Sequence, residues 1–457
     1  MFPFALFNDS FYDFGVKPCG YDFIVYFCLR LFFPLRHCRQ CTTLLSVTQD
    51  KVPILLISDA ISAQTGLARI TRDLSTRVHE HLGDVYRVGV AGYGGTGSRT
   101  FPFPQYNLAL DEWICLNLPE IVEDFAGRER CKVMFIWDLH RLSWFSQPER
   151  LAGESLAKHP MLKQWLLTAN IEKIAYVPLD SSGPNDKLSF PIALTALGFD
   201  RLLAYGQFGE SLLRRTIGDT EADKRHLTNL PHGIDLSMFH ERNRKVSRNA
   251  FLHLTGALPL LSILGRNTVI KPIAEDEILV GCVSTNQARK NLPLACEIIA
   301  LLARNYKVRF WMHTDILERA WSIPSLLIDY GILDRTLISL GFLPDEKMAS
   351  GYSACNVTLG VGSEGWGLPL AESLACGTPV IHTSYAGGAD IVPRDMQVDP
   401  ISFYYEGSYA SKRPVYHPHD WADKALGWTG RRATMDSRYD WKFNWSDWET
   451  WFRAAAQ

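Results

Sequence analysis

Short apolar runs alternate with segments of helical periodicity through most of this 457-residue chain. A continuous apolar run is typical of a parallel strand that is covered on both faces. The first series of runs lies at residues 52–57, 85–91, 133–137, 174–179 and 202–205. The second series lies at residues 278–283, 308–312, 337–340, 357–361 and 380–382. We therefore expect two doubly wound parallel sheets, each in an α/β domain, with a cleft between the carboxyl ends of their strands.

Breaks in this alternation divide the chain into segments. Residues 51–235 and 276–430 each hold one series of strands, and the length of the chain suits two domains of about 200 residues each. Residues 236–275 contain a charged run and no clear strand, so we expect an interdomain connection there. Residues 431–457 form a Trp-rich tail, in which residues 445–456 predict an amphipathic helix that docks on another part of the protein.

Residues 1–50 differ from the rest of the chain. They are rich in Phe, Tyr and Cys and show no clear periodicity, which predicts a poorly ordered extension. Their longest apolar run, residues 23–29, has seven residues, whereas a membrane span needs about 20. The alternative is a peripheral membrane patch, in which apolar side chains lie beside arginines. Its residues would be Phe32, Phe33, Leu35, Arg30, Arg36 and Arg39.

Charge and cysteine content exclude several classes of protein. Lys and Arg number 47 and Asp and Glu number 49, for a formal net charge of −2. A chain with this balance lacks the positive field that binds nucleic acid. Six of the ten cysteines lie singly in predicted strands and helices, which favours a reduced, cytoplasmic protein over a disulfide framework. Cys38 and Cys41 form one CxxC pair without a second pair, so we expect no zinc site there.

Residues 92–97 match the pattern GxGxxG and follow a predicted strand. A dinucleotide-binding fingerprint also requires its third glycine to open a helix. Here Pro102 and Pro104 follow shortly after, and prolines disfavour a helix at that place. We therefore interpret this segment as a Gly-rich loop.

The most informative segment, residues 362–381, follows the predicted strand at residues 357–361. Pro369 suits the first turn of a helix and Gly377 suits its end, which predicts a short helix over residues 369–376. The free amides at the N-terminus of that helix would attract phosphate.

Two carboxylates lie near the start of this predicted helix. Glu364 lies in the preceding loop and Glu372 in the helix, while Gly365 and Gly367 allow backbone amides to approach a ligand closely. Carboxylates are good acceptors for sugar hydroxyls. Donors for phosphate together with acceptors for hydroxyls are what a nucleotide sugar requires.

This segment resembles the E-x7-E motif of GT-B glycosyltransferases, in particular those of family 4. Four further segments resemble motifs of that family, in the family's order. They are TGLAR at residues 65–69, LPHGID at 230–235, NQARKN at 286–291 and GFLPDE at 341–346. The resemblance covers nearly everything after residue 51. It implies a GT-B fold of two Rossmann-like domains, an acceptor domain and then a nucleotide-sugar donor domain, with a C-terminal helix that crosses back onto the first.

The resemblance implies roles for the matching residues. Glu372 would hold the ribose hydroxyls, Glu364 would accept from a hydroxyl of the transferred sugar, and Lys290 with Arg289 would neutralise the departing diphosphate. Arg69, on the first predicted helix, is expected on its solvated face. The implied donor-binding residues are Gly66, Arg289, Lys290, Phe342, Leu343, Glu364, Gly365, Trp366, Gly367, Leu368 and Glu372.

The candidate catalytic residues are Glu364, Lys290, Asp180, Asp138 and His140. Asp180 stands where many family members have a His, and it would orient an acceptor or sugar hydroxyl. Asp138 and His140, which follow another predicted strand, are its rivals. For all three the alternative is a capping or turn role. A second departure is Thr285, at a place where members often have an Arg, for which Arg289 is the candidate substitute.

The resemblance implies that a sugar moves from a nucleotide diphosphate sugar to a hydroxyl of a glycan, a lipid or a small molecule, with retention of anomeric configuration. The chain has no Asp-x-Asp, the motif with which other glycosyltransferases hold a metal ion, so we expect metal-independent chemistry without a cofactor. Two alternatives stay open. One is another reaction of this fold, such as nucleotide-sugar epimerisation or glycan phosphorolysis, and the other is an inactive nucleotide-sugar-binding or scaffold protein.

Overall fold

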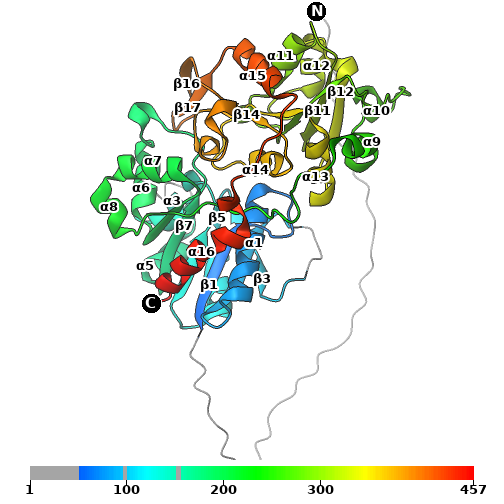
Figure 1. The fold of residues 1–457 in the computed structure, drawn as a ribbon. Helices are drawn as coiled ribbons and strands as arrows, with labels where there is room; N and C mark the ends of the chain where they lie inside the picture. Colours follow the sequence, from blue (N-terminus) through cyan, green and yellow to red (C-terminus); the bar gives the residue numbers. More distant parts are fainter. Residues whose placement is uncertain (1–50, 96–99, 151–155) are drawn as a thin grey trace, which may run out of the picture. The chain divides into compact units, whose positions relative to one another are not determined.

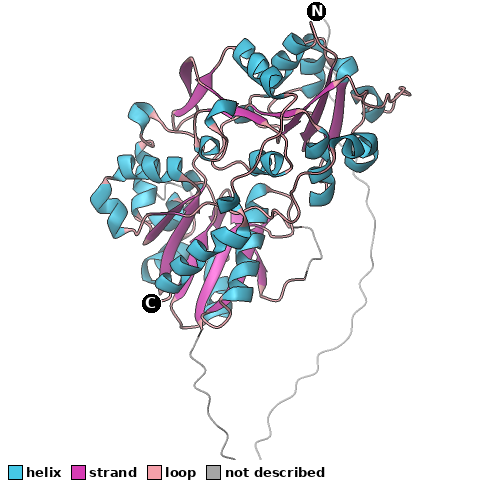
Figure 2. Ribbon diagram, in the orientation of Figure 1, coloured by secondary structure: helices cyan, strands magenta, loops and turns pink. Residues whose placement is uncertain are grey.

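The computed structural model describes residues 51–95, 100–150 and 156–457 (Figure 1). The expected N-terminal extension with its CxxC pair and candidate membrane patch lies outside these residues, as do Thr96 and Gly97 of the Gly-rich segment. The strands form two large parallel sheets with helices beside them (Figure 2). None of the helices in the described ranges is both long and apolar enough to cross a bilayer.

The first sheet has seven parallel strands in the order β3-β2-β1-β6-β7-β8-β9. Its strands are β1 (Val52–Asp59), β2 (Tyr86–Tyr93), β3 (Gln105–Asn107), β6 (Cys131–Phe135), β7 (Ile171–Val177), β8 (Arg201–Ala204) and β9 (Thr228–Asn229). In β1, Ile54 and Leu56 belong to one hydrophobic core, whereas Leu55 and Ile57 belong to a second. Apolar cores on both faces explain the continuous apolar run of this strand. The five strands expected here are confirmed, and only the two- and three-residue edge strands β9 and β3 are additional.

Helix α1 (Gly66–His81) follows β1 and shows how the sequence sets an element. Its N-cap is Thr65, whose side-chain oxygen accepts a hydrogen bond of 3.1 Å from the amide of Ala68. Its apolar face buries Ile70, Leu74 and Val78 against the sheet. The other helices of this half are α2 (Leu118–Ala126), α3 (Ser143–Ser146), α5 (Pro160–Thr168), α6 (Phe190–Leu197), α7 (Gln207–Ile217) and α8 (Asp219–Lys224).

The second sheet has six parallel strands in the order β12-β11-β10-β13-β14-β15. Its strands are β10 (Ile278–Val283), β11 (Val308–Thr314), β12 (Thr336–Leu340), β13 (Val357–Gly360), β14 (Val380–Thr383) and β15 (Gln397–Val398). Its helices are α11 (Leu292–Leu302), α12 (Ile323–Asp329), α13 (Asp345–Ala354), α14 (Leu368–Ala375) and α15 (Pro418–Trp428). The strand order reverses between β10 and β13, as it does between β1 and β6, and open α/β sheets bind ligands at such switch points.

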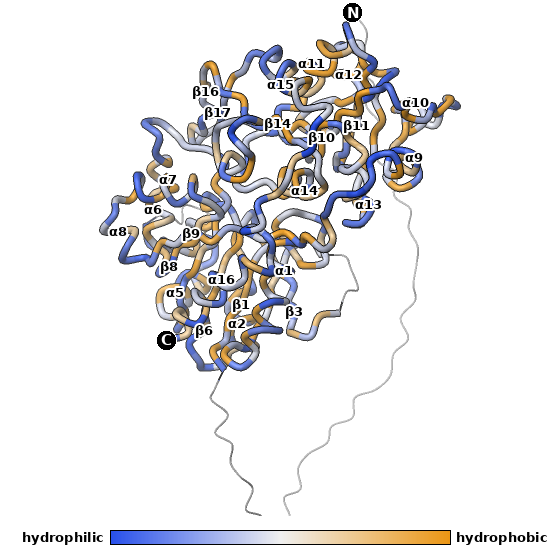
Figure 3. Tube along the Cα trace, viewed as in Figure 1, coloured by the Kyte–Doolittle hydropathy of each residue, from blue (hydrophilic) through white to orange (hydrophobic). Residues whose placement is uncertain are grey.

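The charged run predicts a connection over residues 236–275, and the structure shows that the middle of this segment folds onto the second sheet. Helix α9 (Arg244–Thr255) packs against α13, and its hydrophilic start is blue in Figure 3. Arg248 donates hydrogen bonds to the backbone carbonyls of Ala354 and Glu277. Leu258 pairs with Ile338 of β12, next to the short helix α10 (Leu260–Ile263). Arg248 of the charged run therefore binds backbone groups of the second half.

A small antiparallel hairpin stands outside both large sheets and is not predicted by the sequence. It consists of β16 (Ser402–Glu406) and β17 (Ser411–Val415). Tyr404 and Tyr405 are about half exposed, so the hairpin lacks the apolar run that marks a buried strand. A second pair, β4 (Leu110–Asp111) and β5 (Ile114–Cys115), is shorter still.

The C-terminal helix α16 (Trp441–Ala455) packs on the first half of the protein, which confirms the expected crossing. The indole of Trp448 donates a hydrogen bond of 3.1 Å to the carbonyl of Pro231, and its ring lies edge-on to Tyr176. The hydroxyl of Tyr86 in β2 donates to the carbonyl of Phe452 at 2.7 Å. The tryptophans of this helix are buried and serve packing.

We predict that Trp448→Ala lowers the free energy of unfolding by about 3–5 kcal/mol, because it opens a cavity between α16 and the first sheet. Urea unfolding of the full chain measures the change. Phe443→Ala on the same helix is the matched control, because that ring is 55% exposed and should change stability by less than about 0.5 kcal/mol. Equal losses in the two variants would contradict the packing role of α16.

Candidate functional site

Loops from both sheets meet at the carboxyl ends of central strands. Glycines allow close contact there: a Cβ on Gly365 would lie only 2.9 Å from the Cβ of Pro178, which follows β7. A Cβ on Gly362 would lie 2.6 Å from the Cα of Lys290, in the loop after β10. Both glycines belong to the loop between β13 and α14, so this loop packs tightly on its neighbours from both halves.

Gly367 turns that loop into helix α14. Its φ of 102° is a conformation in which a residue with a side chain would be strained. Pro369 occupies the first turn of the helix, which begins one residue before the predicted start and ends one residue before the predicted end. The N-terminus of α14 also lies near α1, because a Cβ on Gly66 would lie 3.6 Å from Cδ1 of Leu368.

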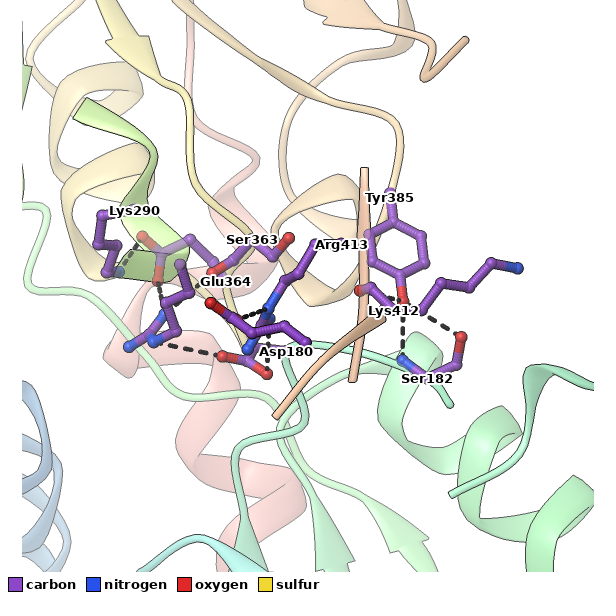
Figure 4. Close-up of polar contacts among 10 residues, drawn as sticks. Asp180, Ser182, Lys290, Ser363, Glu364, Tyr385, Lys412 and Arg413 are labelled. Carbon is purple, nitrogen blue, oxygen red and sulfur yellow. Dashed lines mark hydrogen bonds and ion pairs between the residues drawn. The ribbon is translucent and has the colours of Figure 1, made fainter. Parts of the chain in front are cut away.

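Lys290 and Glu364 form a buried ion pair in which the ammonium donates to Oε1 of the carboxylate (Figure 4). Arg289 joins them: its Nη1 lies 3.7 Å from Oε2 of Glu364 and donates a 2.9 Å hydrogen bond to the carbonyl of Ser363. Burial favours the neutral carboxyl, but the charges of Lys290 and Arg289 outweigh it and hold the pKa of Glu364 below its usual value. Burial and the charge of Arg289 lower the pKa of Lys290 in spite of Glu364.

Asp180 lies in the loop after β7, between two arginines from the second half of the protein. Its Oδ2 is 3.3 Å from Nε of Arg289 and its Oδ1 is 3.5 Å from Nη1 of Arg413. Burial alone would raise the pKa of Asp180, but the two guanidinium groups hold it below its usual value. An ionised, low-pKa carboxylate is a poor proton acceptor at neutral pH and a good hydrogen-bond acceptor.

The rival candidates Asp138 and His140 follow β6 on the same edge of the first sheet. Asp138 pairs with Arg141 at 3.5 Å, and the ring of His140 lies 5.5 Å from that of Tyr409. Burial lowers the pKa of His140, although Asp138 opposes that shift. The structure thus joins Asp180, Lys290 and Glu364 in one ion-pair network, whereas Asp138 and His140 make separate contacts beside it.

Glu372 is buried in α14, and both of its carboxylate oxygens have partners. Arg69 of α1 binds Oε1 at 2.5 Å, and the hydroxyl of Tyr352 donates to Oε2 at 2.8 Å. Burial raises the pKa of Glu372, and Arg69 and Tyr352 offset only part of that shift. The expectation that Arg69 lies on a solvated face is wrong: its side chain is 16% exposed and also lies 3.5 Å from Asp345.

The remaining expected donor residues fall into two groups. Phe342 is exposed and Leu343 is half-buried, in the loop after β12. The side chain of Trp366 is buried against His232 and Tyr439, at ring distances of 5.6 and 5.9 Å. This indole packs where the two halves join, so only the backbone at Trp366 can face a ligand.

Two further residues shape the loops, and the sequence predicts no role for either. Asn286 is fully buried and donates from its side-chain amide to the carbonyl of Trp321, while its Oδ1 accepts from the amide of that residue. His382 is fully buried, and its Nδ1 lies 2.6 Å from the carbonyl of Gly360. Burial lowers the pKa of His382 to about 4.

Three or more His, Cys, Asp or Glu side chains arranged to ligate a metal do not occur in residues 51–95, 100–150 and 156–457. The candidate site instead holds carboxylates that pair with four cations, Arg69, Arg289, Lys290 and Arg413. Such a site can bind an anion and the hydroxyls of a polyol.

Comparison with known proteins shows which family model and which solved structures this chain is similar to. Residues 266–395, which hold β10 to β14 and α14, match a family model described as "Glycosyl transferases group 1". The crystal structure of Anabaena HepE in complex with UDP and glucose superposes with a TM-score of 0.58, at 14% identity, over 88% of this chain and all of that one. The chain has the GT-B fold. The catalytic domain of Arabidopsis starch synthase IV bound to ADP and acarbose (TM-score 0.53, 10% identity) and the lipopolysaccharide-biosynthesis glycosyltransferase WaaG (TM-score 0.52, 12% identity) are also similar. They cover 89% and 83% of this chain, and this chain covers 99% and 90% of theirs.

Two curated relatives are similar over part of their length. The O-antigen chain mannosyltransferase B of Escherichia coli is 29% identical over 131 residues, 26% of this chain and 34% of the relative. The D-inositol 3-phosphate glycosyltransferase of Mycobacteroides abscessus is 26% identical over 210 residues, 45% of this chain and 39% of the relative. The similarity thus spans between a third and two fifths of the length of these relatives.

We predict strong coupling between Lys290 and Glu364. Glu364→Gln leaves a buried ammonium without its partner and should lower the free energy of unfolding by about 3 kcal/mol. Lys290→Met should cost less, because Arg289 still faces Glu364. The double variant should lose less stability than the sum of the single changes, by about 1–3 kcal/mol in a urea-unfolding cycle. Additive losses would contradict the pairing.

We also predict a pH dependence from His382. Its pKa is about 4 in the folded protein and about 6.5 in an unfolded chain, so between these values the unfolded chain binds a proton that the folded protein does not. The free energy of unfolding should therefore fall by up to about 3 kcal/mol from this group as the pH drops from 6.5 to 4.

His382→Asn, whose amide can replace the ring nitrogen at the Gly360 carbonyl, should flatten that fall. Urea unfolding at several pH values measures it. The exposed His419, changed to Asn, is the control. An unchanged pH profile in His382→Asn would refute the assignment.

Proposed function

We propose that this protein is a glycosyltransferase of family 4 that moves a sugar from a nucleotide diphosphate sugar to a hydroxyl acceptor. The observation that carries the proposal is the Lys290–Glu364–Arg289 cluster, formed by the loop after β10 and the loop that leads into α14. Both loops lie inside the segment that matches the group 1 glycosyltransferases. The cations of this cluster can bind a polyanion, and its carboxylate can bind the hydroxyls of a polyol. We propose that residues 51–235 form the domain that binds the acceptor and that residues 276–430 form the domain that binds the donor.

The donor diphosphate would lie between the N-terminus of α14 and the two cations. The backbone amides of residues 366–368 would donate to phosphate oxygens, and Arg289 and Lys290 would neutralise the charge that develops on the departing diphosphate. These fixed cations supply what a metal ion would otherwise supply, so we propose transfer without a metal or a further cofactor.

The two carboxylates of the E-x7-E segment would hold hydroxyls of the donor. An ionised carboxylate offers about four acceptor positions, so Glu372 can accept from ribose hydroxyls while Arg69 and Tyr352 remain bound to it. Glu364 would accept from the transferred sugar. Phe342 and Leu343 would face the base.

The acceptor would lie over the first sheet, near Asp180, Asp138 and His140. Asp180 would orient a hydroxyl as a hydrogen-bond acceptor, in keeping with its low pKa, and we propose retention of anomeric configuration. The relatives named above include a mannosyltransferase of O-antigen chains and a structure with UDP and glucose, which favours a hexose donor and a glycan or lipid acceptor. The six described cysteines are free and buried, which favours a reducing, cytoplasmic location.

A nucleotide-sugar-binding protein without turnover is the second candidate. Two differences from the family pattern favour it. Thr285 stands where members often have an Arg, and Asp180 stands where many members have a His. This candidate predicts that donor binds and that no sugar is released or transferred.

We expect one of UDP, GDP and ADP to raise the melting temperature of the full chain. A nucleotide at 100 times its Kd adds about 2.7 kcal/mol to stability, which differential scanning fluorimetry detects. Lys290→Met should lose most of this shift, and Lys307→Met, an exposed lysine of the same half, should keep it. Release of sugar from the matching sugar nucleotide then separates the enzyme from the binding protein. The donor-site proposal is withdrawn if no nucleotide shifts the wild type.

A further inference from the structure

The hairpin β16–β17 belongs to the second half of the chain and docks on the first. The amide of Lys412 donates a 2.7 Å hydrogen bond to the carbonyl of Ser182, and its ammonium lies 2.7 Å from Oδ1 of Asp186. The hydroxyl of Tyr385 accepts from the amide of Ser182 at 2.8 Å and donates to the carbonyl of Lys412 (Figure 4). These contacts fix the hairpin to the loop that follows β7.

Arg413 projects from this fixed hairpin to the candidate site. Its side chain is only 11% exposed. Its Nε binds Oε2 of Glu406 in the neighbouring strand at 2.8 Å, and its Nη1 lies 3.5 Å from Oδ1 of Asp180. Arg413 therefore holds one oxygen of Asp180 while Arg289 faces the other, at 3.3 Å.

The charges in this network are paired before any ligand binds. Arg289, Lys290 and Arg413 face Asp180, Glu364 and Glu406. Under the proposed function, a donor diphosphate brings further negative charge and draws Arg289 toward it. Asp180 then loses one of its two guanidinium partners, and a partly buried carboxylate left without a cation is unfavourable. Arg413 is held by Glu406 of its own hairpin and stays with Asp180.

We infer that Arg413 is a positioning residue that holds Asp180 in place when Arg289 turns to the donor diphosphate. The inference rests on the proposed function. Without Arg413, Asp180 competes with the diphosphate for Arg289, so the protein binds diphosphate less tightly although Arg413 itself does not touch it. The nearby Lys412 cannot take over, because it pairs with Asp186.

The test is a double-mutant cycle read by calorimetry on the full chain. The ligands are the nucleoside diphosphate that binds the wild type, out of UDP, GDP and ADP, and the corresponding nucleoside, which lacks phosphate. Arg413→Met should weaken diphosphate binding about ten-fold and leave nucleoside binding unchanged. Asp180→Asn should bind the diphosphate at least as tightly as the wild type, because Arg289 is then no longer paired with a charged Asp180. Arg413→Met in the Asp180→Asn background should then have little effect.

Lys412→Met is the matched control, because it removes an ion pair of the same hairpin without touching Asp180. Its diphosphate affinity should equal that of the wild type. An equal loss in Lys412→Met would attribute the effect to hairpin docking and overturn the role of Arg413. A ten-fold loss that persists in the Asp180→Asn background would show that Arg413 attracts the diphosphate by its own charge and not through Asp180. That result would also overturn the positioning role of Arg413.

The other results are equally decisive. If Arg413→Met does not fold, Asp180→Asn alone decides, since weaker diphosphate binding in that variant contradicts the competition. If Arg413→Met binds diphosphate like the wild type, the inference fails and the proposed function stands. A wild type that binds none of the three nucleotides overturns both.

Discussion

Charged side chains buried between two sheets require partners, and the loops of this protein are arranged to supply them. Removing an ammonium or a carboxylate from water costs several kcal/mol unless an opposite charge and hydrogen bonds replace the water. Lys290, Arg289, Glu364 and Asp180 meet this requirement only together, because they come from loops after three different strands. The same loops therefore determine how the halves touch and what kind of ligand the protein can hold.

The pairing of charges extends from the site to the fold. Arg69 reaches from α1 to Glu372 in α14, and Arg413 reaches from the hairpin to Asp180. Each contact joins the two halves at the edge where the strands end. In addition, the backbone of Ile234 pairs with Tyr439 and with Trp441, the first residue of α16, through hydrogen bonds of 2.8 and 3.0 Å. Polar contacts at the site and backbone pairing at the crossing thus hold one arrangement of the halves.

The sequence predicts the parts of the protein that depend on local patterns. The strands β1 and β10 can be predicted because both of their faces are buried, which requires continuous apolar runs. The loop and the start of α14 can be predicted because Gly367 and Pro369 each suit the backbone conformation at their own position. The contacts of Arg69 and Arg413 are not visible, because their partners lie 303 and 233 residues away in the chain. An ion pair between distant segments produces no periodic pattern in the sequence, and an exposed hairpin produces no apolar run.

The position of α16 has a consequence for how the protein is made. The side chains that it covers, among them Tyr86 and Tyr176, are synthesised before the second sheet, whereas Trp448 and Phe452 are synthesised after it. One apolar face of the first sheet therefore stays without its cover until the whole second sheet has been synthesised. A nascent chain with such an exposed face is prone to aggregate. Exposure of that face during synthesis is the consequence of covering the first sheet with a helix that follows the second sheet in the chain.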